Sequence, residues 1–149
     1  MNIPINENAP VKSRNQMEIQ APIDTVWQIL TDIKHWTRWQ KAVTETIIEH
    51  PVAEGTVFKW KAGGLFFKSR IHTSTLNTAF GWTGTTLGAS AIHNWSFMKK
   101  DNYTTIVLVE ESLQGFFPTL FKKSFQKNLD KGVLINLTEL KVASELAVK

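Results

Sequence analysis

Residues 90–115, SAIHNWSFMKKDNYTTIVLVEESLQG, decide the fold class of this chain. Large apolar side chains alternate with smaller or polar ones over 90–99, which is the two-residue period of a β-strand. The segment 104–114 is also interpreted as a strand, with Val107, Val109 and Glu111 on one face and Ile106, Leu108 and Glu110 on the other. Asp101-Asn102 between the two segments is typical of a turn. We therefore predict an antiparallel hairpin.

The turn sets the register of this hairpin and aligns side chains across it. Three pairs are expected to share one face: Phe97 with Val107, Trp95 with Val109, and His93 with Glu111. A carboxylate beside an imidazole can orient the ring for proton transfer, so His93 and Glu111 are candidates for a catalytic acid/base pair. The alternative is a hydrogen-bonded polar pair that holds two strands in register.

Five further strands are expected on the N-terminal side of the hairpin. Alternation indicates strands at 14–20, 56–61, 66–76 and a segment carrying Phe80 and Trp82. The segment 43–49 is rich in β-forming residues and ends at His50-Pro51. A helix from about 23 to 32 and a helical turn around 35–40 follow the first of these strands. The predicted order of elements is β-α-α-β6-α.

After Gly115 the pattern changes from strand to helix. One helix is expected from Pro118 to about Ser144, roughly 27 residues and about 40 Å long. Its apolar stripe consists of Phe117, Phe121, Phe125, Leu129 and Val133. Four lysines fall mostly off that stripe: Lys122, Lys123, Lys127 and Lys131. They are interpreted as a solvated helix face, with phosphates or an anionic membrane as the alternative.

These elements predict an α+β fold in which a curved antiparallel sheet of about seven strands wraps around the C-terminal helix. Because a helix cannot fill the whole concave face of a bent sheet, an internal cavity is expected between them. The 149 residues fit one domain over 13–149, preceded by a flexible N-terminal arm over 1–12.

The composition of the chain excludes some classes of site and of partner. The absence of cysteine excludes disulfides, cysteine nucleophiles and cysteine–metal sites. The formal net charge of +4 is too small to indicate nucleic-acid binding by itself. Neither a signal peptide nor a run of about 18 apolar residues is visible, so a cytoplasmic location without a membrane span is expected.

Metal and cofactor motifs are missing from the sequence. The four histidines are scattered and lack the spacing that places two ligands on one helix face: His35, His50, His72 and His93. The sequence contains no nucleophile elbow, P-loop or dinucleotide-binding motif. We therefore expect neither a metal nor a cofactor.

Aromatic rings are the most informative part of the composition. Six tryptophans and nine phenylalanines stand against one tyrosine, which indicates a thick core or a ring-lined pocket. Alternation places one set toward the cavity: Phe58, Trp60, Phe67, Trp82, Trp95, Phe97, Phe121 and Phe125. For a single ring a packed core is the simpler interpretation, but the set is typical of a pocket for a flat or lipidic ligand. The predicted ligand contacts are these rings other than Phe97, together with Ser69, His93 and Glu111.

The sequence also resembles a known superfamily. Residues 21–27 (APIDTVW), 31–33 (TDI) and 36–39 (WTRW), with 93–97 (HNWSF) and 110–115 (EESLQG), resemble the SRPBCC superfamily in its polyketide cyclase/dehydrase and lipid-transport branch. This superfamily also includes the START domains and the birch-pollen-allergen-like proteins.

The resemblance implies a helix-grip fold whose cavity binds hydrophobic small molecules, with catalysis in only some members. It also implies that Trp36, Arg38 and Trp39 lie at the cavity mouth. Alternatively, the two indoles brace the short helices against the sheet.

Two functions therefore compete. The first is binding of a lipid, isoprenoid or polyketide-like molecule, with His93, Glu111 or Ser69 orienting its polar end. The second is a cyclase/dehydrase-type enzyme with His93 as acid/base, which the small number of inward polar groups disfavours. A third, an interaction module that uses Ile106 and Leu108 on the outer sheet face, has weaker support. The expected partner is a hydrophobic small molecule and not nucleic acid, and the chain is expected to be a monomer or weak homodimer.

Overall fold

The computed structural model describes residues 2–149 and shows a helix-grip fold with one antiparallel sheet of seven strands. The strand order is β1-β7-β6-β5-β4-β3-β2. The strands are β1 (Val11–Ile19), β2 (Val43–Ile48), β3 (Val57–Ala62), β4 (Leu65–Thr75), β5 (Ala79–Thr86), β6 (Ala89–Asp101) and β7 (Thr104–Gln114). The predicted α+β class and the antiparallel sheet of about seven strands are confirmed.

The hairpin of β6 and β7 has the predicted register. Its pairs include Phe97 with Val107, Trp95 with Val109, and His93 with Glu111. All of these side chains except Glu111 are buried, and Glu111 is half-buried. This face of the hairpin therefore faces the interior, which positions the polar pair among aromatic neighbours.

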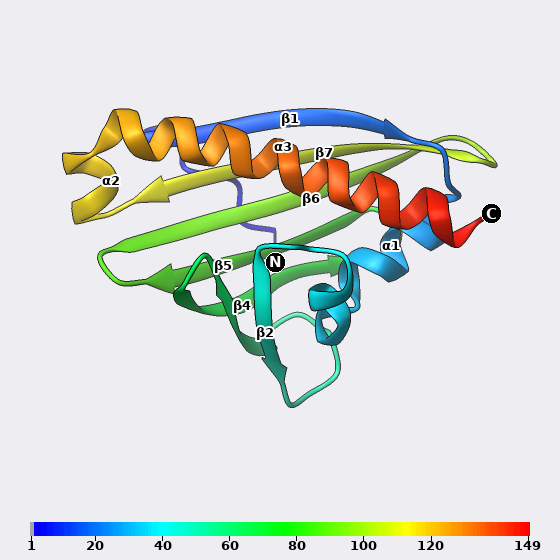
Figure 1. The fold of residues 1–149 in the computed structure, drawn as a ribbon, viewed down its shortest axis with the longest axis horizontal. Helices are drawn as coiled ribbons and strands as arrows, with labels where there is room; N and C mark the ends of the chain where they lie inside the picture. The colour runs from blue at the N-terminus through cyan, green and yellow to red at the C-terminus, as the bar shows by residue number, and fades with distance from the viewer. Residues whose placement is uncertain (1) are drawn as a thin grey trace.

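Two short helices follow β1 and close one end of the sheet (Figure 1). They are α1 (Ile23–Thr31) and a 3₁₀ helix, η1 (Ile33–Arg38). Trp36 is almost fully buried, donates its indole N–H to the Leu30 carbonyl at 2.7 Å, and packs edge-on against Phe58 and Trp60. Trp36 thus braces the short helices against the sheet.

The C-terminal helical region is two helices rather than the single predicted one. Helix α2 (Phe116–Leu120) is separated from α3 (Lys122–Ala147) at Phe121, whose backbone has φ −113° and ψ 43°. Phe117 explains the break, because its N–H bonds the Gly88 carbonyl at 3.2 Å and its ring packs against Gly88 in the β5–β6 turn. Helix α2 is thereby held on this turn, while α3 takes another direction.

Helix α3 lies mainly along β1, with further contact to α1 and β7 (Figure 1). Its buried positions are Leu129, Val133, Leu137, Leu140 and Ser144, which share one face at helical spacing. Helix α3 therefore covers the β1–β7 side of the concave sheet. It does not cover the inner faces of β3–β6 near the hairpin turns.

The N-terminal segment differs from the expected flexible arm. Strand β1 begins at Val11, and residues 2–10 pack on the outer face of the sheet, with Ile5 only 5% exposed. The Ile3 N–H donates to Nδ1 of His72 at 3.2 Å, and the amide of Asn94 donates to the Ile3 carbonyl at 2.8 Å. These contacts join positions that are distant in sequence, which local patterns do not reveal. Met1 of the expected arm lies outside the described residues.

Across residues 2–149, no helix combines the length and apolar character needed to cross a bilayer.

Candidate functional site

A pocket of about 120 Å³ lies on the inner face of the sheet, near the β3–β4 and β5–β6 turns. Its lining comes entirely from β3 to β7: Trp60, Phe67, Ser69, Trp82, Gly84, Thr86, Ala89, Ser90, Ala91, His93, Glu111 and Leu113. Helix α3 is absent from this lining, which is built from strand residues alone. The expected cavity between sheet and helix is thus a pocket within the sheet.

The polar group of this pocket is the cross-strand pair of His93 and Glu111. Nδ1 of His93 lies 2.9 Å from Oε2 of Glu111, and the two side chains are 6% and 15% exposed. A carboxylate can only accept, so Nδ1–H donates to Glu111, and whenever the ring is neutral its lone pair lies on Nε2. Glu111 therefore determines which nitrogen of His93 can accept a hydrogen bond.

The second nitrogen of His93 is buried and unpaired. No described residue hydrogen-bonds Nε2 of His93, although less than 1 Å² of this atom is exposed. The imidazole stacks on Trp82, with ring centroids 4.4 Å apart and planes 10° apart, and it also stacks on Trp95. An unpaired polar atom in such surroundings costs free energy until a partner binds it.

An aromatic wall faces this pair. Trp60 and Phe67 stack with centroids 4.7 Å apart, and the indole N–H of Trp60 donates to the Ser69 hydroxyl at 3.1 Å. Gly84 pairs with Ser69 across β4 and β5, and a Cβ at Gly84 would lie 2.8 Å from that hydroxyl oxygen. The glycine therefore leaves space for Ser69 at the pocket wall.

Six of the predicted ligand contacts line the pocket: Trp60, Phe67, Ser69, Trp82, His93 and Glu111. The pattern could also have indicated Gly84, Ala91 and Leu113, because alternation places them on the same inner faces. These three residues have neither polar nor aromatic side chains, so the sequence pattern gives no reason to single them out as ligand contacts.

Four predicted contacts lie elsewhere. Phe58 and Trp95 belong to the buried core, as does Phe97 of the predicted ring set, and Phe125 packs against the edge of the core. Phe121 is 53% exposed, so the expectation that it faces the cavity is wrong. It lies at the break between α2 and α3, where the regular helical spacing used for the prediction is lost.

The remaining predicted groups do not enter the pocket. The described lining includes none of Trp36, Arg38 and Trp39, although Trp39 packs against the core. The four lysines Lys122, Lys123, Lys127 and Lys131 are exposed. Among residues 2–149, no cluster of three or more histidine, aspartate or glutamate side chains could hold a metal ion.

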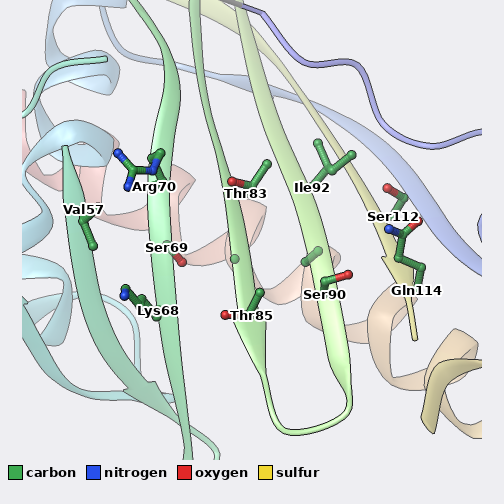
Figure 2. Close-up of a pocket in the computed structure, with 12 residues that line it drawn as sticks. Val57, Lys68, Ser69, Arg70, Thr83, Thr85, Ser90, Ile92, Ser112 and Gln114 are labelled. Carbon is green, nitrogen blue, oxygen red and sulfur yellow. The ribbon is translucent and has the colours of Figure 1, made fainter. Parts of the chain in front are cut away.

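A larger depression of about 500 Å³ lies on the opposite, outer face of the sheet. Figure 2 shows Arg70, Thr83 and Ile92 projecting from neighbouring strands on this face. Its lining mixes basic, hydroxyl and aliphatic side chains, and Arg70 already donates to the Gly55 carbonyl at 3.0 Å. This open polar surface lacks the enclosed aromatic walls of the inner pocket.

Residues 10–138 match the protein family described as polyketide cyclase / dehydrase and lipid transport. The chain belongs to this family. The match spans the sheet, both short helices and most of α3, so the suspected superfamily is confirmed. No curated protein matches this polyketide cyclase/dehydrase and lipid-transport family member in sequence.

Solved structures share the fold at low sequence identity. The hypothetical protein jhp0584 from Helicobacter pylori is 19% identical with a TM-score of 0.83, covering 93% of this chain and 90% of its own. The Zhui aromatase/cyclase from Streptomyces sp. R1128 is 13% identical with a TM-score of 0.81, covering 93% and 95%. A START superfamily protein from Mycobacterium smegmatis is 12% identical with a TM-score of 0.77, covering 91% and 98%. These likenesses establish the helix-grip fold of this family member.

Proposed function

We propose that this protein binds a lipophilic small molecule whose hydroxyl group donates a hydrogen bond to Nε2 of His93. The proposal rests on His93, which lines a pocket walled by aromatic rings and whose buried Nε2 has no hydrogen-bond partner among the described residues. Glu111 holds Nδ1–H, so Nε2 of the neutral ring is an acceptor and selects a donor on the ligand.

The size of the pocket limits what can enter it. Ligand pockets for drug-sized molecules are typically about 300–1,000 Å³, whereas a dry cavity of about 150 Å³ accepts benzene. The pocket of about 120 Å³ thus suits one planar ring or the end of an apolar chain. The rest of a larger ligand would extend toward the hairpin turns that border the pocket.

Both apolar burial and a hydrogen bond would contribute to the binding free energy of the ligand. Apolar contact with Trp60, Phe67 and Trp82 would supply most of the affinity, at about 25 cal/mol per Å² of apolar surface removed from water. The hydrogen bond to His93 would add about 0.5–1.5 kcal/mol, which is up to roughly tenfold in affinity. The preference for a hydroxyl-bearing ligand would therefore depend mainly on His93.

A second candidate function is a cyclase/dehydrase-type enzyme acting in the same pocket. The observation that favours it is the imidazole held by a carboxylate with its other nitrogen unpaired, which is the arrangement of a general base. In that case Nε2 of His93 would accept a proton from the substrate and return it in a later step. The lining offers few further polar groups, so we place binding first.

The binding proposal is tested with a matched pair of ligands, para-propylphenol and propylbenzene, by isothermal titration calorimetry. The wild type should bind the phenol up to about tenfold more tightly than the hydrocarbon. The His93→Phe variant should lose this preference and keep its affinity for propylbenzene. A control variant, His50→Phe, changes an exposed histidine and should behave like the wild type. Equal affinities for the two ligands in the wild type, or no binding of either, would overturn the proposal.

Native mass spectrometry of freshly purified protein, followed by extraction of any bound compound, identifies the natural ligand class. The extracted compound can then be incubated with wild type and His93→Gln. A change in its mass or isomer that requires His93 would favour the enzyme, whereas recovery of the unchanged compound supports binding.

A further inference from the structure

Six large apolar side chains are exposed together at the end of the sheet that carries α2. We call them the hydrophobic rim: Leu65, Phe66, Leu87, Phe116, Leu120 and Phe121. Each is between 50% and 81% exposed. Single exposed apolar residues are normal, but a contiguous group of them marks an interaction site.

Contacts between three segments bring the rim together. The Thr86 hydroxyl donates to the Phe66 carbonyl at 2.8 Å, which links the start of β4 to the β5–β6 turn. The Phe117 N–H bonds the Gly88 carbonyl and links that turn to α2. The ring of Phe117 also contacts Phe116 and Phe121, at 5.3 and 6.4 Å between centroids. Figure 1 shows α2 beside this end of the sheet.

The charge around the rim is uniformly positive. The segments 61–68, 84–90 and 115–127 contain five lysines and no acidic residue. The five are Lys61, Lys68, Lys122, Lys123 and Lys127. The ammonium of Lys61 lies 5.1 Å from the centroid of the Phe66 ring, so charge and apolar surface are in direct contact. Among the described residues, none of these lysines forms an ion pair.

We propose that the hydrophobic rim docks on an anionic lipid bilayer, with its apolar side chains inserted at the interface and the lysines paired with lipid phosphates. Apolar side chains flanked by basic ones are what such a surface recognises, and each lysine near it contributes about 1 kcal/mol. A second copy of the chain is a poorer occupant, because its five lysines would face the same five here. The inference depends on the rim alone and does not require the proposed ligand.

The rim also borders the inner pocket. Phe67 and Thr86 line the pocket and adjoin Phe66 and Leu87 of the rim in sequence. Docking would therefore place the pocket beside the bilayer, where lipophilic molecules are concentrated. A ligand could pass between membrane and pocket without crossing water.

Vesicle flotation tests the proposal. The wild type should float with phosphatidylcholine vesicles that contain about 30% phosphatidylserine and bind at least about tenfold less to pure phosphatidylcholine. Binding should weaken at about 1 M salt, because screening acts on surface charges. The rim variant Leu87→Ser/Phe116→Ser/Leu120→Ser and the charge variant Lys122→Gln/Lys123→Gln should each lose most of the bound fraction.

A matched control uses exposed apolar residues outside the rim, two in the β4–β5 and β6–β7 turns and one, Met98, on β6. Leu76, Met98 and Tyr103 are 60–77% exposed, so Leu76→Ser/Met98→Ser/Tyr103→Ser removes similar exposed apolar surface elsewhere. This variant should bind vesicles within about twofold of the wild type, and circular dichroism should show that both triple variants are folded. Failure of the wild type to float, or equal losses in rim and control variants, would overturn the proposal. Loss of a dimer in the rim variant by analytical ultracentrifugation would also overturn it, by assigning the rim to a second copy.

Discussion

The side chains of His93 and Glu111 meet across β6 and β7, with Nδ1 2.9 Å from Oε2. The contact lies on the inner face of the sheet, where the flanking pairs of the same two strands, Trp95 with Val109 and Ala91 with Leu113, are apolar. A polar pair in such surroundings needs both partners, because either one left alone would be a buried unsatisfied group. The contact with Glu111 therefore fixes the orientation of the His93 ring in the pocket.

Glu111→Leu should lower the affinity for para-propylphenol by up to about tenfold, because Nδ1–H loses its acceptor and the tautomer of His93 is no longer fixed. It should also lower the free energy of unfolding by about 1–3 kcal/mol, measured by urea denaturation. Glu111→Gln keeps an acceptor oxygen and should retain the phenol preference in calorimetry. Wild-type affinity in Glu111→Leu would show that the carboxylate does not orient the ring.

Gly81→Ala should destabilise the protein by about 1–3 kcal/mol. A Cβ at Gly81 would lie 2.6 Å from both Oδ1 of Asn94 and Cε1 of His72, and these two side chains are hydrogen-bonded at 2.9 Å. The substitution must therefore displace buried His72 or half-buried Asn94, which lie over the backbone of Gly81. Urea denaturation monitored by tryptophan fluorescence measures the change.

The matched control for this glycine is Gly132→Ala in α3, where a Cβ would meet no atom within 4 Å. This change should raise the free energy of unfolding by about 0.5–1 kcal/mol, because alanine favours a helix interior. If both alanine variants changed stability in the same direction, the close contact at Gly81 would not be the cause.

Ile5→Ala should lower the free energy of unfolding by about 2–4 kcal/mol, because Ile5 is buried by the packing of the N-terminal segment on the sheet. A flexible arm would tolerate this change without effect. Ile47→Ala, at a position 44% exposed on β2, should stay within about 0.5 kcal/mol of the wild type in the same thermal or urea assay.

Glu145→Gln should destabilise the protein at neutral pH and leave it unchanged in acid. The hydrogen bond from Lys141 and then that from the Gln20 N–H, at 2.9 Å, hold the pKa of Glu145 below its ordinary value of 4.5. A lowered folded-state pKa contributes stability above the unfolded pKa, and this contribution is lost as pH falls through the folded pKa.

The free energies of unfolding of wild type and Glu145→Gln should differ by under about 1 kcal/mol at neutral pH, because the Glu145 side chain is partly exposed. Thermal unfolding of wild type and Glu145→Gln between about pH 7 and pH 3 measures it. The two curves should converge below pH 4.5, the ordinary pKa of the group. If the difference in stability between the two proteins stayed constant with pH, it would come from packing of the Glu145 side chain and not from its charge.

Much of the sheet was predictable because its information is local. Alternation over 90–99 and 104–114, joined by Asp101-Asn102, set a register that aligned His93 with Glu111. The period of two also assigned Trp60 and Trp82 to the inner face. These inferences needed only the geometry of a strand and a turn.

The order of the elements along the chain, the register of the last hairpin and the pairing of His93 with Glu111 follow from local sequence patterns. The tertiary structure, by contrast, sets where the helical region breaks, because the break at Phe121 depends on Phe117 meeting Gly88 in a distant turn. It likewise decided that Ile3 and Ile5 are packed, since their partners lie far along the chain. Periodicity reports which face a residue occupies within one element, whereas burial depends on which elements meet, and that is set by the whole fold.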